Sequence, residues 1–266
     1  MPEGHTIHRA ARDLSRMLVG SIIDVTSPQG RFASGAAVLD GRECYVAEAY
    51  GKHLLLHFDG EIFLHIHLGL FGRIRKHKIP AKDPRGAVRV RLVSATHVVD
   101  INGPTICEII ERESMEKLIC RIGPDLIRDD ADPDRAYERI SKSRVTIGKL
   151  LMDQSEIAGI GNIYRTEILW RQSIHPDTAG RAITRRQFES LWTDAKELLT
   201  IGVKRNAIIT VDDPPARPRV GERLNIFNKA ECPTCAGPIA RLKISGRRAF
   251  VCVNCQPLVP NKKLRV

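Results

Sequence analysis

The 266-residue sequence contains no apolar run that approaches the roughly 20 residues needed to span a bilayer. Its first 20 residues also lack the apolar core of a secretory signal peptide, because charged residues such as Glu3, Arg9 and Asp13 interrupt them. Neither an internal repeat nor a low-complexity tract is present. We therefore expect a cytoplasmic protein with no membrane partner, whose cysteines stay reduced.

Acidic residues are the minority among the charged ones. The chain has 31 Asp and Glu against 42 Lys and Arg, a formal net charge of +11. This excess favours a polyanionic partner, nucleic acid ahead of a membrane surface. The length is sufficient for a substantial core, and we expect two domains plus a small module. Nothing in the sequence implies an obligate oligomer, so a monomer is expected.

Four of the seven cysteines form two C-x2-C pairs separated by 16 residues: Cys232, Cys235, Cys252 and Cys255. This spacing is typical of two knuckles that hold one tetrahedral zinc ion through four thiolates. A disulfide is disfavoured in a reducing compartment, and a redox motif needs only one pair. With four thiolates the Zn²⁺ site is expected to be structural. The other three are expected to be ordinary buried thiols: Cys44, Cys107 and Cys120.

Hydrophobic periodicity and turn signals predict an α+β fold. Apolar residues at helical spacing over 3–19 predict a leading helix. A β-rich region over about 21–111 predicts a β-sandwich, with strands Ile22–Val25, Cys44–Ala47, His53–Phe58, Ile62–His67, Val88–Val93 and His97–Ile101. Helices follow at Asp134–Ile140, Ile147–Asp153, Asn162–Arg171 and Arg185–Ile201, the last with a capping box from Thr184 and Gln187. The cysteine pairs then frame a β-hairpin.

The N-terminus carries a possible nucleophile. If Met1 is removed, Pro2 becomes a free secondary amine, and an α-amino group titrates near pH ~7.7–8.0. Such an amine attacks sugar C1′ or carbonyl carbons to give iminium adducts. Glu3 beside it can act as a general acid or base. The alternative reading is a proline and a carboxyl that merely open a helix.

Several further positions suit contacts with phosphate. The glycine-bearing turn 158–161 exposes N–H groups at a helix start, where Asn162 can assist, although a plain helix–helix turn is equally consistent. Arg247 lies at a hairpin tip that zinc would hold rigid. Lys52 follows a glycine at the mouth of a strand. For both, ordinary exposed surface is the alternative.

An apolar, glycine-rich loop spans residues 68–72 and is followed by a basic stretch with Arg73, Arg75, Lys76 and Lys78. An apolar tip with a basic surround suits insertion into a base stack, whereas such a loop taken singly is more often core. Just before it, His65 and His67 alternate on one face of a strand. A metal pair is one reading of them, and hydrogen-bonded strand histidines are the favoured one.

Taken together, five segments resemble the bacterial formamidopyrimidine-DNA glycosylase/endonuclease VIII family of base-excision repair enzymes. They cover nearly the whole chain in the family's order: Pro2-Glu3-Gly4, Gly51-Lys52-His53-Leu54-Leu55, Arg121-Ile122-Gly123-Pro124-Asp125, LLMDQSEIAGIGNIY (150–164) and GRRAFVCVNCQ (246–256). The resemblance implies a catalytic β-sandwich domain (1–120), a helical DNA-binding domain with a helix–two-turn–helix (121–223), and a zinc finger with a basic tail (224–266). Pro-Glu-Gly at the start leans toward the endonuclease VIII branch and hence toward oxidised pyrimidines.

By that resemblance, the chain is a bifunctional DNA glycosylase and apurinic/apyrimidinic lyase acting on damaged DNA. Pro2 attacks C1′ and forms an imine, and Glu3 supplies or relays a proton. Lys52 and Arg247 match residues assigned to β- and δ-elimination, and we expect both chiefly to bind flanking phosphates. Arg121 and Asn162 match DNA-contact positions.

The loop is where the sequence departs from the family pattern. Leu70 and Phe71 are the candidates for filling the gap left by an extruded nucleotide, while Gly69 replaces a glutamine frequent in endonuclease VIII relatives. His5 and His53 are further differences that would tune pKa values in the cleft. Two readings stay open beside the lead: a lesion-binding protein of the same fold without chemistry, and the purine-directed branch of the family.

Overall fold

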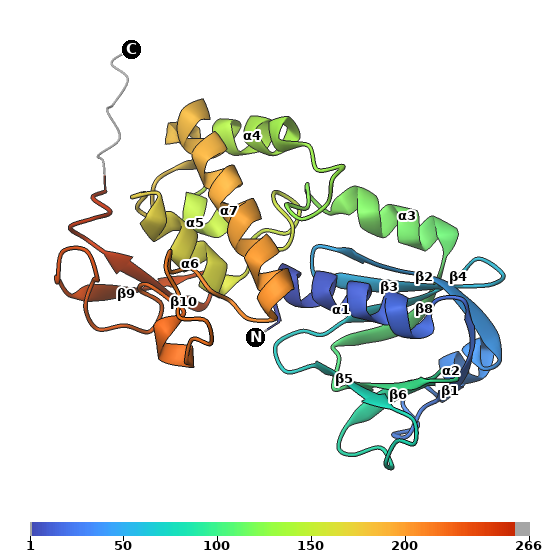
Figure 1. The fold of residues 1–266 in the computed structure, drawn as a ribbon. Helices are drawn as coiled ribbons and strands as arrows, with labels where there is room; N and C mark the ends of the chain where they lie inside the picture. Colours follow the sequence, from blue (N-terminus) through green and yellow to red (C-terminus); the bar gives the residue numbers. More distant parts are fainter. Residues whose placement is uncertain (1, 259–266) are drawn as a thin grey trace. The chain divides into compact units, whose positions relative to one another are not determined.

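Figure 1 shows the computed structural model, which describes residues 2–258. The chain divides into two compact units, Met1–Arg121 and Ile122–Val266, which we call unit 1 and unit 2. Each has its own apolar core. Within the described range, every helix falls short of the length and apolar content that crossing a membrane requires. The basic tail expected at the C-terminus lies outside the described residues from position 259 on.

Unit 1 is built on antiparallel strands in the order β5-β7-β6-β1-β2-β3-β4-β8. Strand β1 joins two layers, because its first half pairs with β2 and its second half with β6. The predicted β-sandwich is thus confirmed. The strands are β1 (Ser21–Thr26), β2 (Arg42–Tyr50), β3 (His53–Phe58), β4 (Ile62–His67), β5 (Arg73–Lys78), β6 (Val88–Val93), β7 (His97–Asn102) and β8 (Ile106–Glu111).

Helix α1 (Gly4–Leu18) forms as the periodicity predicts, and its apolar face joins the core between the layers. Its Ser15 hydroxyl donates to the Ala47 carbonyl of β2 at 3.1 Å. On its other side, the Asp13 carboxylate accepts a hydrogen bond of 2.6 Å from Lys76 of β5. The helix therefore contacts both layers, which fixes the position of the N-terminal residues that precede it.

Four elements of unit 1 were not predicted: α2 (Ala33–Leu39), α3 (Arg112–Arg121) and strands β5 and β8. The stretch predicted as a basic surround of the loop is strand β5, an edge strand that pairs only with β7 and leaves most of its side chains exposed. An edge strand of this kind needs no apolar alternation, so periodicity misses it. Helix α3 covers the far face of β3 and β4, where Met115 packs with Leu55 and Phe63.

Unit 2 begins with helices α4 (Pro133–Lys142), α5 (Ile147–Leu150), α6 (Asn162–Arg171) and α7 (Arg185–Arg205), with a short 3-10 turn η1 (Gly180–Ala182) before α7. The predicted capping box is present: the Gln187 N–H donates to Thr184 Oγ1 at 3.2 Å, and the Thr184 N–H donates to Gln187 Oε1 at 3.0 Å. Helix α5 is shorter than expected, ending at Leu150 rather than residue 153.

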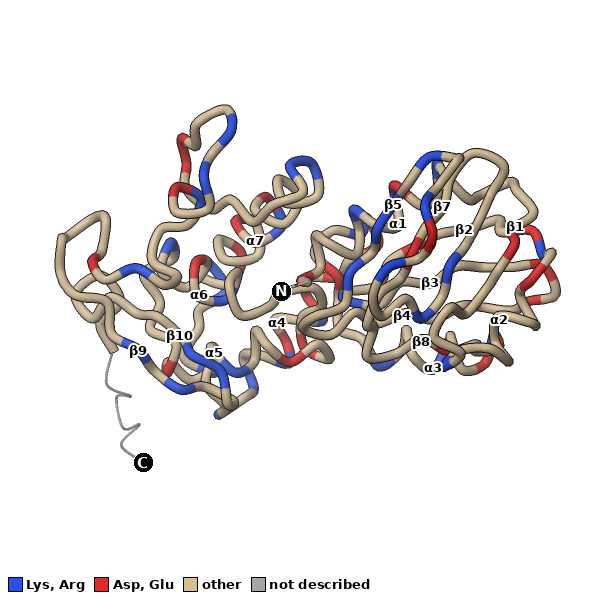
Figure 2. The backbone as a smooth tube through the Cα atoms, turned by 90° about the horizontal axis from the view of Figure 1, so that it is seen from below, with Lys and Arg blue, Asp and Glu red and all other residues tan. Residues whose placement is uncertain are grey.

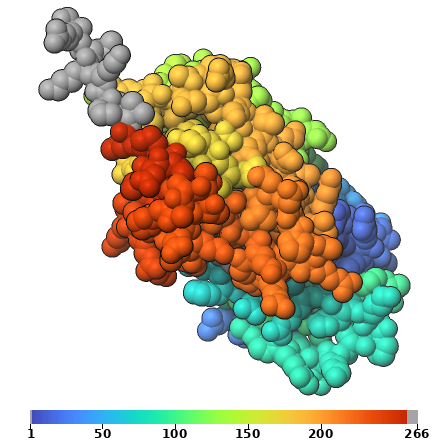
Figure 3. All heavy atoms as spheres, turned by 60° about the vertical axis from the view of Figure 1, so that its left-hand side comes forward, coloured from blue at the N-terminus to red at the C-terminus, as the bar shows by residue number. Residues whose placement is uncertain are grey.

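The rest of unit 2 contains the turn η2 (Val220–Glu222) and a hairpin of β9 (Ile239–Ile244) and β10 (Arg247–Cys252). Buried Glu167 of α6 binds this part of the chain, accepting hydrogen bonds from the backbone N–H groups of Asn225, Ile226 and Phe227. Figure 3 shows the hairpin module, in red, directly against the yellow and orange helical segments of the same unit. The hairpin is thus seated on α6.

Candidate functional site

Pro2 and Glu3 stand immediately before α1, which begins at Gly4. The Glu3 side chain is completely buried, whereas Pro2 is half-buried. The Glu3 carbonyl accepts from the Thr6 N–H at 2.9 Å, and the Glu3 N–H faces Thr6 Oγ1 at 3.5 Å. These contacts hold the residue next to Pro2 in place. A carboxyl withdrawn from water beside an amine can move protons in that amine's chemistry.

Lys52 lies in the two-residue turn that joins β2 to β3. The flanking residues Tyr50 and His53 pair across the hairpin, and Gly51 takes a φ of +57°. A positive φ at the first turn residue favours glycine and matches the twist of a hairpin. The turn therefore places Lys52 at the end of the sheet, half-buried, directly before the first residue of β3.

Next to Lys52, three side chains form a continuous hydrogen-bonded chain. His53 Nδ1 lies 2.9 Å from His65 Nε2, and His65 Nδ1 lies 2.9 Å from Glu108 Oε1. Strand register explains this arrangement, because His65 of β4 pairs directly with Glu108 of β8, while His53 of β3 is its diagonal neighbour. The favoured prediction of hydrogen-bonded strand histidines is confirmed for His65.

Burial lowers the pKa of His53 to about 3, with further contributions from His65, His67, Arg121 and Lys52. Burial likewise lowers the pKa of His67, and Lys52 adds to that effect. Lys52 and Arg121, which were predicted separately, therefore both lie close enough to His53 in unit 1 for their charges to act on it. Glu108 was not predicted. Only the strand register could have found it, and β8 itself was missed.

His67 also supports the loop that follows β4. Its Nδ1 accepts the Gly69 N–H at 3.2 Å, and its ring lies 4.9 Å from that of His53. Gly69 has a φ of +64°, and a Cβ there would lie 2.3 Å from the Thr105 side chain. The glutamine of the family pattern is therefore excluded from this loop conformation.

The two apolar residues of the loop are open to solvent. Leu70 is 45% exposed and Phe71 is 86% exposed. An aromatic side chain this exposed contributes little to the fold and is available to contact a partner. Leu68, at the loop's start, is buried in the core and anchors it. The loop thus carries an apolar tip on a fixed base.

In unit 2, the turn 158–161 leads into α6, as predicted. The Gly159 N–H donates to the Gln154 side chain at 3.1 Å, and Gly159 has a φ of +92°. Asn162 opens the helix but is buried: its Nδ2 donates to the Arg248 carbonyl at 2.9 Å, and its Oδ1 accepts from Arg165. Its amide therefore fixes the β-hairpin against α6 in this structure.

The hairpin that contains Arg247 turns through Ser245 and Gly246, which have φ values of +50° and +76°. Two consecutive positive φ values characterise the tight turns that match strand twist. Arg247 follows directly, pairing with Ile244 across the hairpin, and its side chain is exposed. Asn162 and Arg247, far apart in sequence, are thus brought to neighbouring elements.

The four predicted metal-ligating cysteines gather in unit 2, with all their Sγ atoms within 4.8 Å of one another. The Sγ atoms of Cys232 and Cys255 are 3.7 Å apart, and those of Cys235 and Cys252 are 3.4 Å apart. Tetrahedral Zn–S bonds of about 2.3 Å place sulfurs about 3.8 Å apart. The cluster fits one structural zinc ion.

The remaining cysteines differ from one another. Burial raises the pKa of Cys44 and of Cys107 to about 12, which makes them unreactive thiols. Cys44 is buried and Cys107 half-buried, whereas Cys120 is exposed. The prediction of a buried thiol is therefore wrong for Cys120, because it lies on the outer side of α3, away from the strands that this helix covers.

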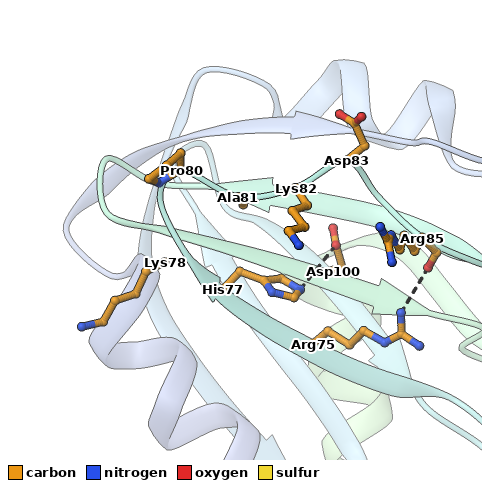
Figure 4. Close-up of a pocket in the computed structure, with 9 residues that line it drawn as sticks. All are labelled: Arg75, His77, Lys78, Pro80, Ala81, Lys82, Asp83, Arg85 and Asp100. Carbon is orange, nitrogen blue, oxygen red and sulfur yellow. Dashed lines mark hydrogen bonds and ion pairs between the residues drawn. The ribbon is translucent and has the colours of Figure 1, made fainter.

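A basic pocket of about 400 Å³ lies over β5 and the segment that follows it. Figure 2 marks the run of Lys and Arg along β5 in blue, and Figure 4 shows Lys82 and His77 directed toward Asp100. Asp100 is itself held by Arg91, whose Nε donates at 2.7 Å. The cationic side chains of Arg75, Lys78, Lys82 and Arg85 therefore outweigh the acidic ones at this surface.

Two family models match the sequence: the formamidopyrimidine-DNA glycosylase N-terminal domain over residues 1–104 and the formamidopyrimidine-DNA glycosylase H2TH domain over residues 122–213. Endonuclease 8 1 of Mycobacterium bovis is 42% identical over 96% of this chain and 100% of that protein. Formamidopyrimidine-DNA glycosylase of Chloroflexus aurantiacus is 28% identical over 96% of this chain and 98% of that protein.

The fold also matches solved structures. Lactococcus lactis Fpg in complex with DNA containing N7-benzyl-Fapy-dG aligns with a TM-score of 0.81 at 23% identity, over 96% of this chain and 100% of that one. The same enzyme with DNA containing an abasic site aligns equally well, at 22% identity. The folds therefore agree over nearly their whole length. The two family models and the relative at 42% identity show that the chain belongs to the formamidopyrimidine-DNA glycosylase/endonuclease 8 family.

Proposed function

We propose that this protein is a bifunctional DNA glycosylase and apurinic/apyrimidinic lyase that excises oxidised pyrimidines. The observation that carries the proposal is the N-terminal arrangement: a proline whose amine is freed by removal of Met1, followed by a completely buried carboxyl. A protein that only binds lesions has no need of either group. The relatives named as endonuclease 8 and formamidopyrimidine-DNA glycosylase support the same class of reaction.

In this mechanism, the Pro2 nitrogen attacks C1′ of the damaged nucleotide, and the bond from C1′ to the base breaks. Glu3 supplies or relays the proton that accompanies opening of the sugar or departure of the base. The resulting iminium ion acidifies the C2′ proton, and its removal is followed by cleavage of the C3′–O bond. Lys52, Arg121 and Arg247 are assigned to phosphates that flank the lesion, where cations bind best.

Reaching C1′ requires the nucleotide to leave the duplex, which costs roughly a few kcal/mol. The exposed side chains of Leu70 and Phe71 are suited to filling the space that it leaves. Asn162 is assigned to holding the hairpin that carries Arg247. To contact a phosphate itself, the Asn162 amide must give up either its bond to the Arg248 carbonyl or the one it accepts from Arg165. A zinc ion bound by the four clustered cysteines would hold this hairpin in its fold.

Borohydride trapping on an oligonucleotide with one abasic site tests the proposal. The protein used has a mass that confirms loss of Met1. Reduction is expected to give a covalent protein–DNA adduct whose proteolytic mapping places the sugar on Pro2. The matched control retains Met1, which converts the Pro2 nitrogen into an amide, and should give no adduct at that residue. Intact DNA binding without any adduct would instead favour a lesion-binding protein.

Substrate choice is tested separately, by excision from duplexes that each contain one lesion. Faster excision of 5-hydroxyuracil or thymine glycol than of 8-oxoguanine is expected. The reverse order would assign the chain to the purine-directed branch while leaving the amine chemistry unaffected.

A further inference from the structure

The hydrogen-bonded chain from His53 to Glu108 orders the ring protons of the two histidines when both are neutral. A carboxylate only accepts, so His65 Nδ1 must donate in its 2.9 Å bond to Glu108. When His65 carries a single ring proton, its Nε2 is bare and accepts the Nδ1–H of His53. His53 in turn has a bare Nε2. The chain therefore presents an unprotonated imidazole nitrogen in the residue next to Lys52.

The two ends of this chain lie in different surroundings. His65 is 3% exposed, whereas the Glu108 side chain is 53% exposed. A proton that reaches Glu108 can therefore pass to water. At the other end, His53 is close enough to Lys52 and Arg121 for both charges to lower its pKa. The chain thus links the locality of the proposed phosphate contacts to solvent through a buried ring.

We propose that His53, His65 and Glu108 form a proton relay that takes up the C2′ proton during strand cleavage. This inference rests on the proposed function. The C2′–H bond breaks, and its electrons form the C1′–C2′ double bond while the iminium nitrogen becomes neutral. His53 Nε2 gains the proton as its Nδ1–H passes to His65 Nε2. The His65 Nδ1–H passes to Glu108, and the carboxylic acid then releases its proton to water.

The relay explains how a histidine in this environment can act as a base. Burial and the cationic neighbours disfavour an imidazolium at position 53, which alone would make it a poor proton acceptor. In the relay, the ring loses one proton as it gains another, so no imidazolium has to persist. The charge that changes is that of Glu108, at the exposed end. His53 is accordingly the proposed catalytic base, and His65 and Glu108 act through it.

Other titratable groups around His53 do not complete such a path. His67 of β4 faces the same ring, but its Nδ1 accepts the Gly69 N–H, so its remaining proton is on Nε2 and it is a donor there. Lys52 and Arg121 are cationic donors. Among the groups that lower the pKa of His53, His65 is hydrogen-bonded to a carboxylate, that of Glu108.

Two substitutions separate proton transfer from hydrogen bonding. In Glu108→Gln, the amide oxygen still accepts from His65 but cannot take up the proton. In His65→Gln, the amide can donate to Glu108 and accept from His53 but cannot pass a proton along. Glu111→Gln, which neutralises another exposed carboxylate of β8, is the matched control. Unchanged thermal unfolding of Glu108→Gln, whose side chain is half-exposed, would show that the fold is intact.

The experiment measures single-turnover cleavage of abasic-site DNA from pH 5 to pH 9, with borohydride trapping in parallel. General base catalysis contributes about 10²–10⁴-fold, so both variants should slow cleavage at least about tenfold. Affinity for a tetrahydrofuran-containing duplex and the yield of trapped adduct should stay unchanged. The pH profile of cleavage should differ between the wild-type protein and Glu108→Gln, because an amide takes up no proton.

Wild-type rates and an unaltered pH profile in Glu108→Gln would overturn the relay and leave a purely structural chain. Loss of DNA affinity equal to the loss of rate would overturn it as well. Failure of the wild-type protein to give any borohydride adduct would instead overturn the proposed function, and the assignment of the C2′ proton with it. The two failures appear in different measurements and are therefore distinguishable.

Discussion

A buried histidine close to the proposed nucleophile makes the stability of unit 1 depend on pH. His5 is 4% exposed, and burial lowers its pKa to about 4. In the unfolded chain the pKa returns to about 6.5, so only the unfolded chain takes up a proton between those values. The contribution of His5 is complete above pH ~6.5 and is lost as the pH falls toward 4.

His5→Gln is expected to reduce the acid sensitivity of folding. Between pH 7 and pH 5 the wild-type free energy of unfolding should decrease by about 2 kcal/mol more than that of the variant. Urea unfolding at several pH values measures the difference. His53→Gln should show a similar effect, because burial lowers its pKa to about 3. Parallel pH dependences in wild type and His5→Gln would show that His5 is not kept neutral by the fold.

Within helix α6, Glu167 joins the helix to the segment that precedes the zinc hairpin. The carboxylate is completely buried and accepts from three backbone N–H groups and from Thr210 Oγ1 at 2.5 Å. Glu167→Gln replaces one acceptor oxygen by a donor that faces other donors. Leaving buried donors without an acceptor costs about 1–3 kcal/mol each.

We therefore expect Glu167→Gln to lower the free energy of unfolding of unit 2 by about 2–4 kcal/mol. Calorimetric melting of the full chain measures this, with Glu197→Gln on the exposed face of α7 as the matched control. A change of less than about 0.5 kcal/mol, ordinary for a surface substitution, would contradict the role assigned to the carboxylate.

The zinc hairpin is the element whose fold depends on a ligand. Metal binding supplies folding free energy to small cysteine-ligated modules, so removal of zinc should unfold the hairpin. Its contact with Trp170 of α6 and the bond from Gln256 to the Ile174 carbonyl, which follows that helix, should be lost with it. DNA affinity should fall at least about tenfold while unit 1 keeps its melting behaviour.

Chelation followed by zinc readdition tests this expectation, with binding to an abasic-analogue duplex and circular dichroism as readouts. Cys255→Ser should reproduce the loss, and Cys120→Ser, an exposed cysteine outside the cluster, should not. Equal DNA affinity of the apo and zinc-loaded forms would refute a role for the hairpin in binding.

The elements also show what a single sequence reveals. Strands β3 and β4, α1 and the α7 capping box follow from apolar spacing and turn chemistry, because their apolar faces are buried. Strands β5 and β8 lie at the two edges of the sheet order, where one neighbour supplies all their strand pairing and apolar alternation is not required. Because β8 was not predicted, neither Glu108 nor its hydrogen bond with His65 could be anticipated.

The residues of the candidate site fall into the same two groups: those recognisable from the local sequence and those whose role depends on distant partners. Pro2, Lys52 and the four cysteines are recognisable because their chemistry or spacing is local in the sequence. The inward bonds of Asn162 and the exclusion of a side chain at Gly69 depend on partners that lie far away in the chain. Arg248 lies in β10 and Thr105 in the loop before β8, and only the folded backbone brings them close. Tertiary packing, rather than motif, determines them.

At the scale of the whole molecule, the net charge of +11 is spread over both units, and the proposed function requires a long series of phosphate contacts. Each phosphate that a cation neutralises releases counterions, so the logarithm of the binding constant should fall linearly with the logarithm of salt concentration. The slope is about −0.9 per phosphate contacted on duplex DNA. A nearly flat response would contradict an extensive phosphate track.

Two pairs of substitutions test whether both units contact the same DNA. Lys78→Gln with Lys82→Gln removes charge from the pocket of unit 1, and Lys243→Gln with Arg248→Gln removes it from the hairpin of unit 2. Each contacted phosphate that is lost should make the slope shallower by about 0.9. If one duplex contacts both units, each pair makes the slope shallower and the two changes add in the quadruple variant, since substitutions that share no partner act independently. If only the hairpin pair changes the slope, the basic pocket lies off the DNA path, and the phosphate contacts of unit 1 are confined to the surroundings of Lys52 and Arg121.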